Sequence, residues 1–254
     1  MSMIRLDDGP DETLIVTMDR SLKANALTLE SVRALGDALR RAFDARPTGL
    51  VLTGSGRFCA GADLAEVRSE VSMGDNLRRF YGPVVKLLHE APVPVVAAIN
   101  GIAAGGGLAL ALACHRRVAS PDAKLQASFV EVGLVPDCGA SYFLVRMLGV
   151  ADAYRFCTAG ALTAAEAHHI GLIDEVVDSG RVTEAAAARA VEMSGSNSEA
   201  HRETLRLLYA ASASDLESAM ELEARVQDRL GRSQQFRAAQ RAFLDGGRNV
   251  VTDR

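Results

Sequence analysis

Apolar residues near the start of the chain follow two different spacings. Leu14, Val16 and Met18 fall at every second position, which is the spacing of a half-buried strand. Between residues 29 and 43 the apolar positions recur every three or four residues instead, and this predicts a helix with one buried face. Thr28 stands directly before that stretch, where its hydroxyl can cap the first turn. The chain therefore opens with a strand followed by an amphipathic helix.

Later apolar runs are continuous rather than alternating. GLVLTGSG at 49–56 and PVVAAI at 94–99 predict strands buried on both faces, and a third short strand is expected near 117–120. Helical spacing at 76–90, and the helix that begins with GGGLALALAC, separate these runs. Buried strands that alternate with helices predict an α/β fold whose mainly parallel sheet is covered by helices.

The pattern changes near residue 183. No strand is predicted between the segments that follow, which are all helical in composition: EAAAARAVEM, RETLRLLYAA, DLESAMELEARVQDRL and SQQFRAAQRAFL. We therefore expect an α/β core over residues 1–182 and a C-terminal helical region over 183–254. Such a region packs on its own core or on a neighbouring subunit.

Composition and charge narrow the class of protein. The 28 Lys and Arg residues are outnumbered by 32 Asp and Glu residues, for a net charge of −4, so no basic excess exists to neutralise nucleic-acid phosphates. The four cysteines show no CxxC or Cys/His spacing, which argues against a metal site. Free thiols and an N-terminus without an apolar leader predict a cytoplasmic protein.

One stretch resembles a membrane span in length alone. No charged residue occurs between Ala91 and Cys114. The stretch contains Pro92, Pro94 and Asn100, and its apolar residues are mostly alanine and valine, so its drive to enter a bilayer is weak. We expect a buried strand, a turn and a helix there, and no association with a membrane.

Two glycine-rich segments follow the predicted buried strands. In VLTGSGRFCAGADL, the small residues at 60–62 allow another group to approach the backbone closely, although a simple strand-to-helix turn would look the same. In NGIAAGGG, residues 105–107 stand where a helix begins, so their N–H groups lack intrahelical partners and lie at the positive end of a helix dipole. Such donors suit an anion. A dinucleotide-binding turn is disfavoured because GIAAGG lacks the GxGxxG pattern.

In combination these motifs resemble the enoyl-CoA hydratase/isomerase (crotonase) superfamily. The similarity covers essentially the whole chain, and the motifs together are highly specific. The matching segments are LKANAL (22–27), VLTGSGRFCAGADL (51–64), PVVAAINGIAAGGGLALALAC (94–114), FVEVGLVPDCGASYFLVRMLG (129–149) and AEAHHIGLIDEVV (165–177).

The resemblance implies a fold, an assembly and a substrate class. The fold would be a spiral of ββα units whose C-terminal helices serve oligomerisation and cover the CoA pocket, in a homotrimer or a dimer of trimers. The substrate would be an acyl-CoA thioester, so that coenzyme A arrives with the substrate and no cofactor is bound permanently. The two backbone N–H groups that hold the thioester oxygen would fall on Ala60 and Gly106.

The same resemblance implies where CoA lies. Its contacts, mostly with backbone atoms, would involve Ala24, Ala62, Asp63 and Leu64. Phe243 on the last helix would touch the nucleotide of a neighbouring subunit. Many members carry a lysine near that point, where this chain has residues 244–246, LDG. Lys23 and Arg57 are further basic candidates for CoA phosphates.

Two departures from the family pattern bear on the reaction. Hydratases of the family use two glutamates, and the equivalent positions in this chain are Ala109 and Phe129. Neither side chain can hold a water molecule or move a proton, so hydration by a pair of carboxylates is expected to be absent or very slow.

Asp137 is the remaining acidic candidate. In GLVPDCG it matches the single acidic residue of family isomerases, and the segment is similar to that of ring-epoxyphenylacetyl-CoA isomerases of phenylacetate catabolism. One carboxylate suffices to remove a proton beside the carbonyl and return it elsewhere, and Phe129 nearby would raise its pKa by desolvation. The sequence context alone favours a helix N-cap for Asp137, and the family resemblance is what favours the catalytic role.

Other reactive residues have weaker support. Glu131 lies two positions beyond Phe129, and Glu66 is expected on the surface of the helix after GAD. Cys59 and Cys138 flank the two functional segments, but no histidine stands at a partner spacing for nucleophilic catalysis. His168 and His169 lie in an alanine-rich helix and are expected to be structural.

The leading hypothesis is therefore an acyl-CoA isomerase in which Asp137 acts as general acid and base. A second hypothesis keeps the fold and the enolate but changes the reaction, for example to decarboxylation or to residual enoyl-CoA hydration. A third is an acyl-CoA-binding module without catalysis.

Overall fold

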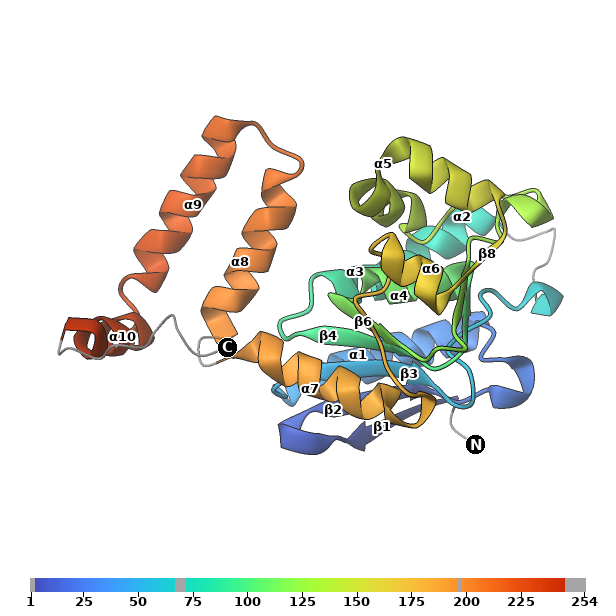
Figure 1. Cartoon of the computed structure of the whole chain (residues 1–254), viewed down its shortest axis with the longest axis horizontal. Helices are drawn as coiled ribbons and strands as arrows, with labels where there is room; N and C mark the ends of the chain where they lie inside the picture. Colours follow the sequence, from blue (N-terminus) through green and yellow to red (C-terminus); the bar gives the residue numbers. More distant parts are fainter. Residues whose placement is uncertain (1–2, 67–71, 196–197, 245–254) are drawn as a thin grey trace. The chain divides into compact units, whose positions relative to one another are not determined.

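The main sheet of the computed structural model is built from the strands that the apolar runs predict. The structure describes residues 3–66, 72–195 and 198–244. Six strands lie in the order β1-β2-β3-β4-β6-β9, with β1 antiparallel to β2 and every other pair parallel (Figure 1). Their bounds are Ile4–Asp8, Leu14–Met18, Leu50–Gly54, Val95–Ile99, Arg116–Ala119 and Glu175–Val176. The expectation of a mainly parallel sheet is confirmed.

A second, three-stranded sheet stands apart from the first and was not predicted. Its order is β5-β7-β8, formed by Ile102–Ala104, Lys124–Gln126 and Ala161–Thr163. Strand β5 covers the residues just before the glycines of NGIAAGGG, and β7 runs parallel to it. This small sheet therefore fixes where the glycine-rich turn begins.

Helices cover both faces of the main sheet, and alternate residues of its central strands face opposite cores. Leu50 and Leu52 of β3 belong to the larger core with α1, α3 and α4, whereas Val51 packs against α7 on the other face. The bounds of the helices around the sheets are Leu29–Asp44 (α1), Met73–Asn76 (α2), Gly82–His89 (α3), Gly106–Ala113 (α4), Ala140–Thr158 (α5), Ala164–His169 (α6) and Val182–Ser194 (α7). Every residue of α4 is buried, so this helix passes through the core.

The helices expected from spacing are present, with one irregularity. Thr28 caps α1 in a reciprocal capping box with Ser31, as its position predicted. The helix expected at 76–90 is instead α2, then the π-helix η4 (Leu77–Tyr81), then α3. The charge-free stretch from Ala91 to Cys114 forms β4, β5 and the buried α4, which confirms the strand, turn and helix expected there.

Short 3-10 helices connect these elements. They are Pro10–Glu12 (η1), Ser21–Lys23 (η2), Leu64–Glu66 (η3), Val130–Val132 (η5) and Ser179–Arg181 (η6). Among the residues that the structure describes, no helix is long and apolar enough to cross a membrane.

The chain divides into two compact units, Met1–Met193 and Ser194–Arg254. This division lies at the C-terminal end of α7, between its last two residues, whereas the sequence pattern placed a boundary at 182/183. The reason is that α7 buries Val182, Ala186 and Ala190 against the strands of the main sheet. An alanine-rich helix looks the same in sequence whether it covers a sheet or belongs to an all-helical region.

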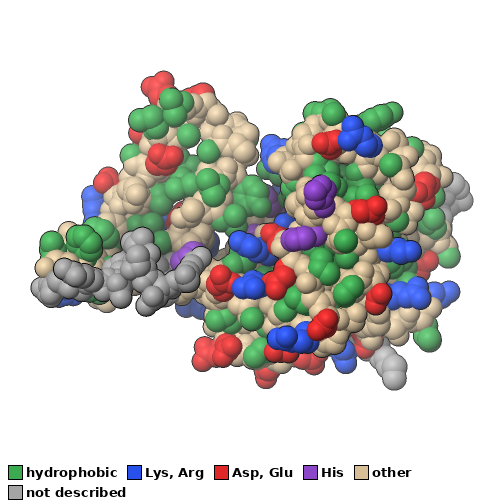
Figure 2. Space-filling model, in the orientation of Figure 1, with side chains coloured by type: hydrophobic (Ala, Val, Ile, Leu, Met, Phe, Trp, Pro, Cys, Tyr) green, Lys and Arg blue, Asp and Glu red, His purple; other side chains and the backbone are tan. Residues whose placement is uncertain are grey.

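The second unit consists of helices α8 (Ser198–Ala211), α9 (Leu216–Leu230) and α10 (Gln234–Leu244). Arg229 of α9 forms ion pairs with Glu199 and Glu203 of α8, and the Glu203 contact measures 3.0 Å. Hydrophobic side chains gather on the face of α8 and α9 seen in Figure 2. Leu208, Leu216 and Met220 are among those more than half exposed.

Candidate active site

The two glycine-rich segments lie side by side although they are far apart in the chain. Cys59 pairs with Ala103 in a parallel bridge, and the backbone N–H of Cys59 donates to the carbonyl of Ile102 at 2.9 Å. In return the N–H of Ala104 donates to the carbonyl of Cys59 at 2.9 Å. The loop after β3 is thus attached to β5, which brings FCAGAD to the start of α4.

Glycine is required where the segments touch. A Cβ atom on Gly107 would lie 2.3 Å from the carbonyl oxygen of Cys59, and one on Gly61 would lie 2.8 Å from that of Ala104. Gly61 and Gly105 also have positive φ angles of 93° and 49°. Any side chain at 107 would therefore separate the two segments. The small residues allow the close approach that the sequence predicted.

The two N–H groups of Ala62 and Gly106 remain without a partner among the described residues. Leu27 and Ala62 form a parallel bridge that uses the residues on both sides of Ala62. The N–H of Leu27 donates to the carbonyl of Gly61, and the N–H of Asp63 donates to the carbonyl of Leu27, so the bridge does not use the N–H of Ala62. Gly106 is the first residue of α4, where an N–H has no intrahelical acceptor. The amides are close, because a Cβ atom on Gly106 would lie 3.9 Å from the Ala62 nitrogen.

Ala60 does not have the free donor that the sequence analysis expected. Its N–H donates to the carbonyl of Ala24 at 3.0 Å, so it is not available to a substrate oxygen. Ala60 still lines the pocket beside Ala62 and Gly106. The spacing of small residues locates the loop, but only the hydrogen-bond pattern shows which of its N–H groups is free.

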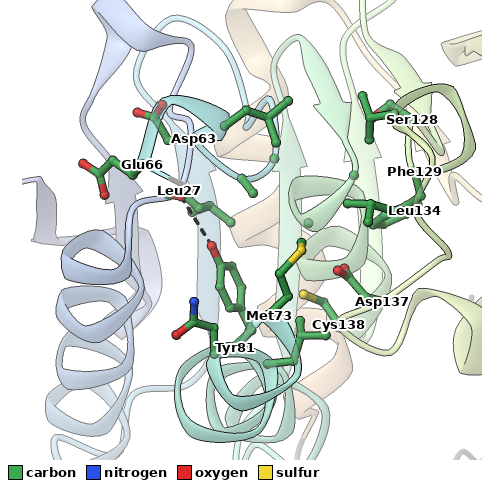
Figure 3. A pocket seen from close by; sticks show the side chains of 18 of the residues that line it. Leu27, Asp63, Glu66, Met73, Tyr81, Ser128, Phe129, Leu134, Asp137 and Cys138 are labelled. Atoms are coloured by element: carbon green, nitrogen blue, oxygen red, sulfur yellow. Dashed lines mark hydrogen bonds between the residues drawn. The ribbon is translucent and has the colours of Figure 1, made fainter. Parts of the chain in front are cut away.

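A pocket of about 300 Å³ opens over these amides. Many of the side chains that line the pocket are apolar or aromatic, including Leu27, Met73, Leu77, Tyr81, Phe129, Val132 and Leu134. The polar side chains are Thr28, Asp63, Glu66, Asn76, Ser128, Asp137 and Cys138. Figure 3 shows Asp137 and Cys138 next to each other, across the pocket from Asp63 and Glu66. An apolar pocket with a few polar groups is typical of a small-molecule site.

Asp137 points into this pocket and is not a helix cap. The residue at the N-cap of α5 is Gly139, and no side chain caps that helix. Burial raises the pKa of the Asp137 carboxyl above its ordinary value. Of the two interpretations that the sequence left open, the N-cap is therefore wrong, and the carboxyl is available in the pocket.

Neither position of the hydratase glutamates holds a polar group. Ala109 is fully buried in α4 and does not line the pocket, whereas Phe129 is 5% exposed and does. Glu131 is held outside the pocket lining, because both of its carboxylate oxygens accept from the Gln126 amide at 3.1 Å. Phe129 thus contributes an apolar wall close to the amides.

Two further carboxylates line the pocket. Asp63 pairs with Arg20 at 3.1 Å and also accepts from the N–H of Ala65, so its carboxylate is occupied by the protein itself. Glu66 on η3 is exposed, as expected, but it lines the pocket, which the sequence analysis did not anticipate.

Cys59 is a structural thiol. It is fully buried, its thiol donates to the carbonyl of Asn25 at 3.1 Å, and burial raises its pKa to about 12. A thiol in that state is not a nucleophile at neutral pH. His168 has its Nδ1 3.0 Å from the carbonyl of Ile173, the local contact that a structural histidine makes.

The residues expected to contact CoA fall into three groups. Ala62, Asp63 and Leu64 line the pocket, and Leu64 is 57% exposed. Ala24 does not line it, but its carbonyl accepts from Ala60 and so supports the same loop. Phe243 belongs to the second compact unit, where it is 69% exposed.

Two residues of the site were not singled out from the sequence. Tyr81 lines the pocket from the π-helix η4, and its hydroxyl donates to the carbonyl of Leu27 at 3.4 Å (Figure 3). Asn25, in the left-handed region at φ 55°, bonds the backbone of the loop after β3 through its side chain. Only the motif LKANAL pointed to Asn25, and no sequence signal distinguished Tyr81 from a core aromatic.

The chain is similar to known proteins along nearly its whole length. Residues 10–253 match the family model described as enoyl-CoA hydratase/isomerase. The chain is 37% identical over 235 residues to a probable enoyl-CoA hydratase of Rhodobacter capsulatus, covering 91% of each chain. It is 33% identical over 239 residues to the 1,2-epoxyphenylacetyl-CoA isomerase of Escherichia coli, again covering 91% of each.

Solved structures show the same similarity. A putative enoyl-CoA hydratase/isomerase from Mycobacterium abscessus superposes with a TM-score of 0.87 at 33% identity, covering 99% of this chain and 100% of that one. A putative enoyl-CoA hydratase from Streptomyces coelicolor gives a TM-score of 0.86 at 36% identity, with coverage of 97% and 94%. The fold class expected from the sequence is confirmed.

Proposed function

Because the chain belongs to the enoyl-CoA hydratase/isomerase family, we propose that it is an acyl-CoA isomerase with Asp137 as its proton-transferring group. The observation behind this proposal is the composition of the pocket. It combines a free pair of backbone donors with a half-buried Asp137, while both hydratase positions hold Ala109 and Phe129. The substrate is an acyl-CoA thioester, and coenzyme A enters as part of it.

The thioester oxygen accepts hydrogen bonds from Ala62 and Gly106. Gly106 opens α4, so the dipole of that helix adds to its own N–H. When a proton leaves the carbon next to the carbonyl, negative charge develops on this oxygen. One well-placed donor stabilises such an oxyanion by about 3–4 kcal/mol. These two donors lower the barrier to forming the enolate, whichever carbon later receives the proton.

The Asp137 carboxylate removes that proton and returns it at another carbon. The C–H electrons move into the enolate or dienolate, and the same carboxylic acid then protonates the distant carbon, so no other reactant is consumed. Burial raises the pKa of Asp137, which makes it a stronger base than an exposed aspartate. A double-bond shift and a ring-epoxide isomerisation both fit this single-carboxylate scheme.

Enoyl-CoA hydration is the second candidate, and a specific observation supports it. Glu66 lines the pocket across from Asp137, so two carboxylates face the substrate space although neither occupies a hydratase position. The Rhodobacter capsulatus relative is named a probable hydratase. Hydration by this pair would add water across the double bond, and the product would distinguish it from isomerisation.

The remaining sequence predictions belong to the same proposal. The second compact unit, with Phe243, serves oligomerisation and contacts the nucleotide of a neighbouring subunit's substrate. The enzyme is a homotrimer or a dimer of trimers. Its cysteines are free in the structure, which supports a reducing cytoplasm.

The test compares wild type with Asp137→Asn on 2-enoyl-, 3-enoyl- and ring-epoxide CoA esters, with products identified by mass spectrometry. We expect isomerised product from wild type and a rate lower by about 10²–10⁴-fold in the variant. Binding of the CoA ester, followed by calorimetry, should remain. Glu131→Gln is the matched control, because it removes a carboxylate outside the pocket lining. Hydrated product as the main species, or full isomerase activity in Asp137→Asn, would overturn the proposal.

A further inference from the structure

Arg20 follows β2, and its side chain reaches the bridge beside the Ala62 N–H. One guanidinium nitrogen donates to the carbonyl of Ala26, and another lies 3.1 Å from the Asp63 carboxylate. These two acceptors belong to the two segments that the bridge joins. The backbone N–H of Arg20 is itself fixed, because it donates to the Asn25 side chain at 2.8 Å. The backbone therefore holds this cation in front of one carboxylate.

Both oxygens of the Asp63 carboxylate are occupied by the protein. Oδ2 faces Arg20, and Oδ1 accepts from the N–H of Ala65 at 3.3 Å, at the start of η3. The side chains of Arg20 and Asp63 are only 20% and 15% exposed, so water and salt screen this ion pair weakly. Loss of the cation would leave a poorly solvated negative charge on the loop.

That charge would lie beside the proposed oxyanion donors. Asp63 is the residue directly after Ala62, and it lines the same pocket. An unpaired carboxylate there would oppose the negative charge that develops on the thioester oxygen, because like charges repel strongly where screening is weak. Glu66 lies on the same side of the pocket (Figure 3), but it is exposed and water screens its charge. Asp63 is therefore the carboxylate whose charge must be balanced by the protein.

We propose that Arg20 is a positioning residue that keeps the Asp63 carboxylate paired, and so keeps net negative charge away from the oxyanion donors. This proposal rests on the proposed role of Ala62 and Gly106. Arg20 does not line the pocket, so it acts on the substrate oxygen only through Asp63.

The kinetic test compares removal of the cation alone with removal of both charges. In Arg20→Gln the Asp63 carboxylate loses its partner, so kcat should fall by about tenfold, which is less than the loss of about 10²–10³-fold when an oxyanion donor is removed. KM should change less, because the oxygen carries more charge in the enolate than in the bound thioester. The double variant Arg20→Gln, Asp63→Asn leaves no carboxylate at this position and should recover most of the lost rate. Arg20→Lys keeps a cation and should stay within about threefold of wild type.

A merely structural role predicts a different order of rates. If the ion pair served only to hold the loop, the double variant would lack both halves of the contact and would be as slow as Arg20→Gln. Arg40→Gln is the matched control, because Arg40 pairs with Asp37 on the exposed face of α1, outside the pocket lining. Rates are compared at a temperature where circular dichroism shows every variant folded, since an unpaired, partly buried charge also lowers stability. A double variant as slow as Arg20→Gln, or wild-type kcat in Arg20→Gln, would overturn the proposal.

A second measurement reports on the donors without turnover. Butyryl-CoA, isotopically labelled at the thioester carbonyl, is bound to each variant, and its carbonyl stretch is recorded by isotope-edited infrared spectroscopy. Hydrogen bonds from Ala62 and Gly106 polarise the carbonyl, so its frequency should fall on binding to wild type. The fall should be smaller in Arg20→Gln and should return in the double variant.

The spectra separate this proposal from the proposed reaction. An equal frequency in wild type and Arg20→Gln would overturn the role of Arg20, and no fall in wild type would overturn the oxyanion donors together with that role. The expected order of frequencies in an enzyme that forms no isomerised product would support the role of Arg20 and reject the proposed reaction.

Discussion

At the residue scale, the Asp137 carboxyl lies in an environment that disfavours its ionised form. Apolar Phe129 and Leu134 line the same pocket, and no cation among the described residues forms an ion pair with it. Asp63, in the same pocket, has Arg20 as a partner. A carboxylate placed for proton transfer is thus stabilised less by the protein than one that supports a loop.

This environment predicts how stability depends on pH. The folded pKa of Asp137 is raised above its ordinary 3.8, so the folded state binds this proton more tightly than the unfolded chain does. The stability that the group contributes is fully present below pH 3.8 and is lost as the pH rises through the folded pKa. Asp137→Asn should therefore be more stable than wild type at neutral pH, and their difference should shrink toward pH 3.8.

Urea unfolding of both proteins at a series of pH values measures that difference, with Glu131→Gln as the control for losing a carboxylate outside the pocket. A difference that did not change with pH, or that favoured wild type at neutral pH, would contradict the environment described for Asp137.

At the scale of elements, the site depends on how one loop is attached to its neighbours. The Asn25 amide donates to the carbonyls of Ser55 at 3.1 Å and Phe58 at 3.3 Å, and its oxygen accepts from the N–H of Arg20 at 2.8 Å. One buried side chain thus joins the segment after β2 to the loop after β3. That loop ends at Ala62, so its geometry reaches the proposed oxyanion donors.

Asn25→Ala should loosen this attachment. It leaves buried carbonyls without their donor, which costs about 1–3 kcal/mol for an unsatisfied group, and it retains the strained φ of 55°. Turnover should also fall, because Ala62 loses its support. Asn25→Gly accommodates the φ but lacks the amide, so improved stability with equally low turnover would assign the effect on the site to the hydrogen bonds. Wild-type stability and turnover in Asn25→Ala would contradict this role.

At the scale of the whole molecule, each of the two compact units presents a different kind of surface. The first unit contains the two sheets, the pocket and the ion pair of buried Arg117 with the partly buried Asp174 at 2.8 Å. The second unit leaves large apolar side chains exposed, including Leu216 at 77% and Met220 at 57%. Exposed apolar groups on one face of a helix are typical of surfaces covered by another chain.

We expect light scattering to give a mass of three or six chains. Leu216 and Met220 lie one turn apart on α9, so the double substitution Leu216→Ser, Met220→Ser should shift the protein toward smaller species. Val226 on the same helix is buried and is left intact, so that α9 can still pack. A monomer in the wild-type protein, or an unchanged mass in the double variant, would contradict this surface as the contact between copies.

The sequence by itself determined the main strands and helices of the core and the two glycine-rich segments that meet beside the pocket. Continuous apolar runs identified β3 and β4, helical spacing identified α1, and the small residues of 60–62 and 105–107 identified two segments that allow close backbone approach. Such features depend on local chemistry and spacing, which a linear pattern preserves. The sequence also shows that Ala109 and Phe129 stand where hydratases carry glutamates, because this requires only the identity of the two residues.

Only the tertiary structure decided which groups are free to act. The N–H of Ala60 bonds to Ala24 while that of Ala62 does not, and Gly139 rather than Asp137 occupies the N-cap of α5. The acceptor of a backbone N–H can come from a distant part of the chain. The sequence around the N–H therefore does not show whether the group is already hydrogen-bonded.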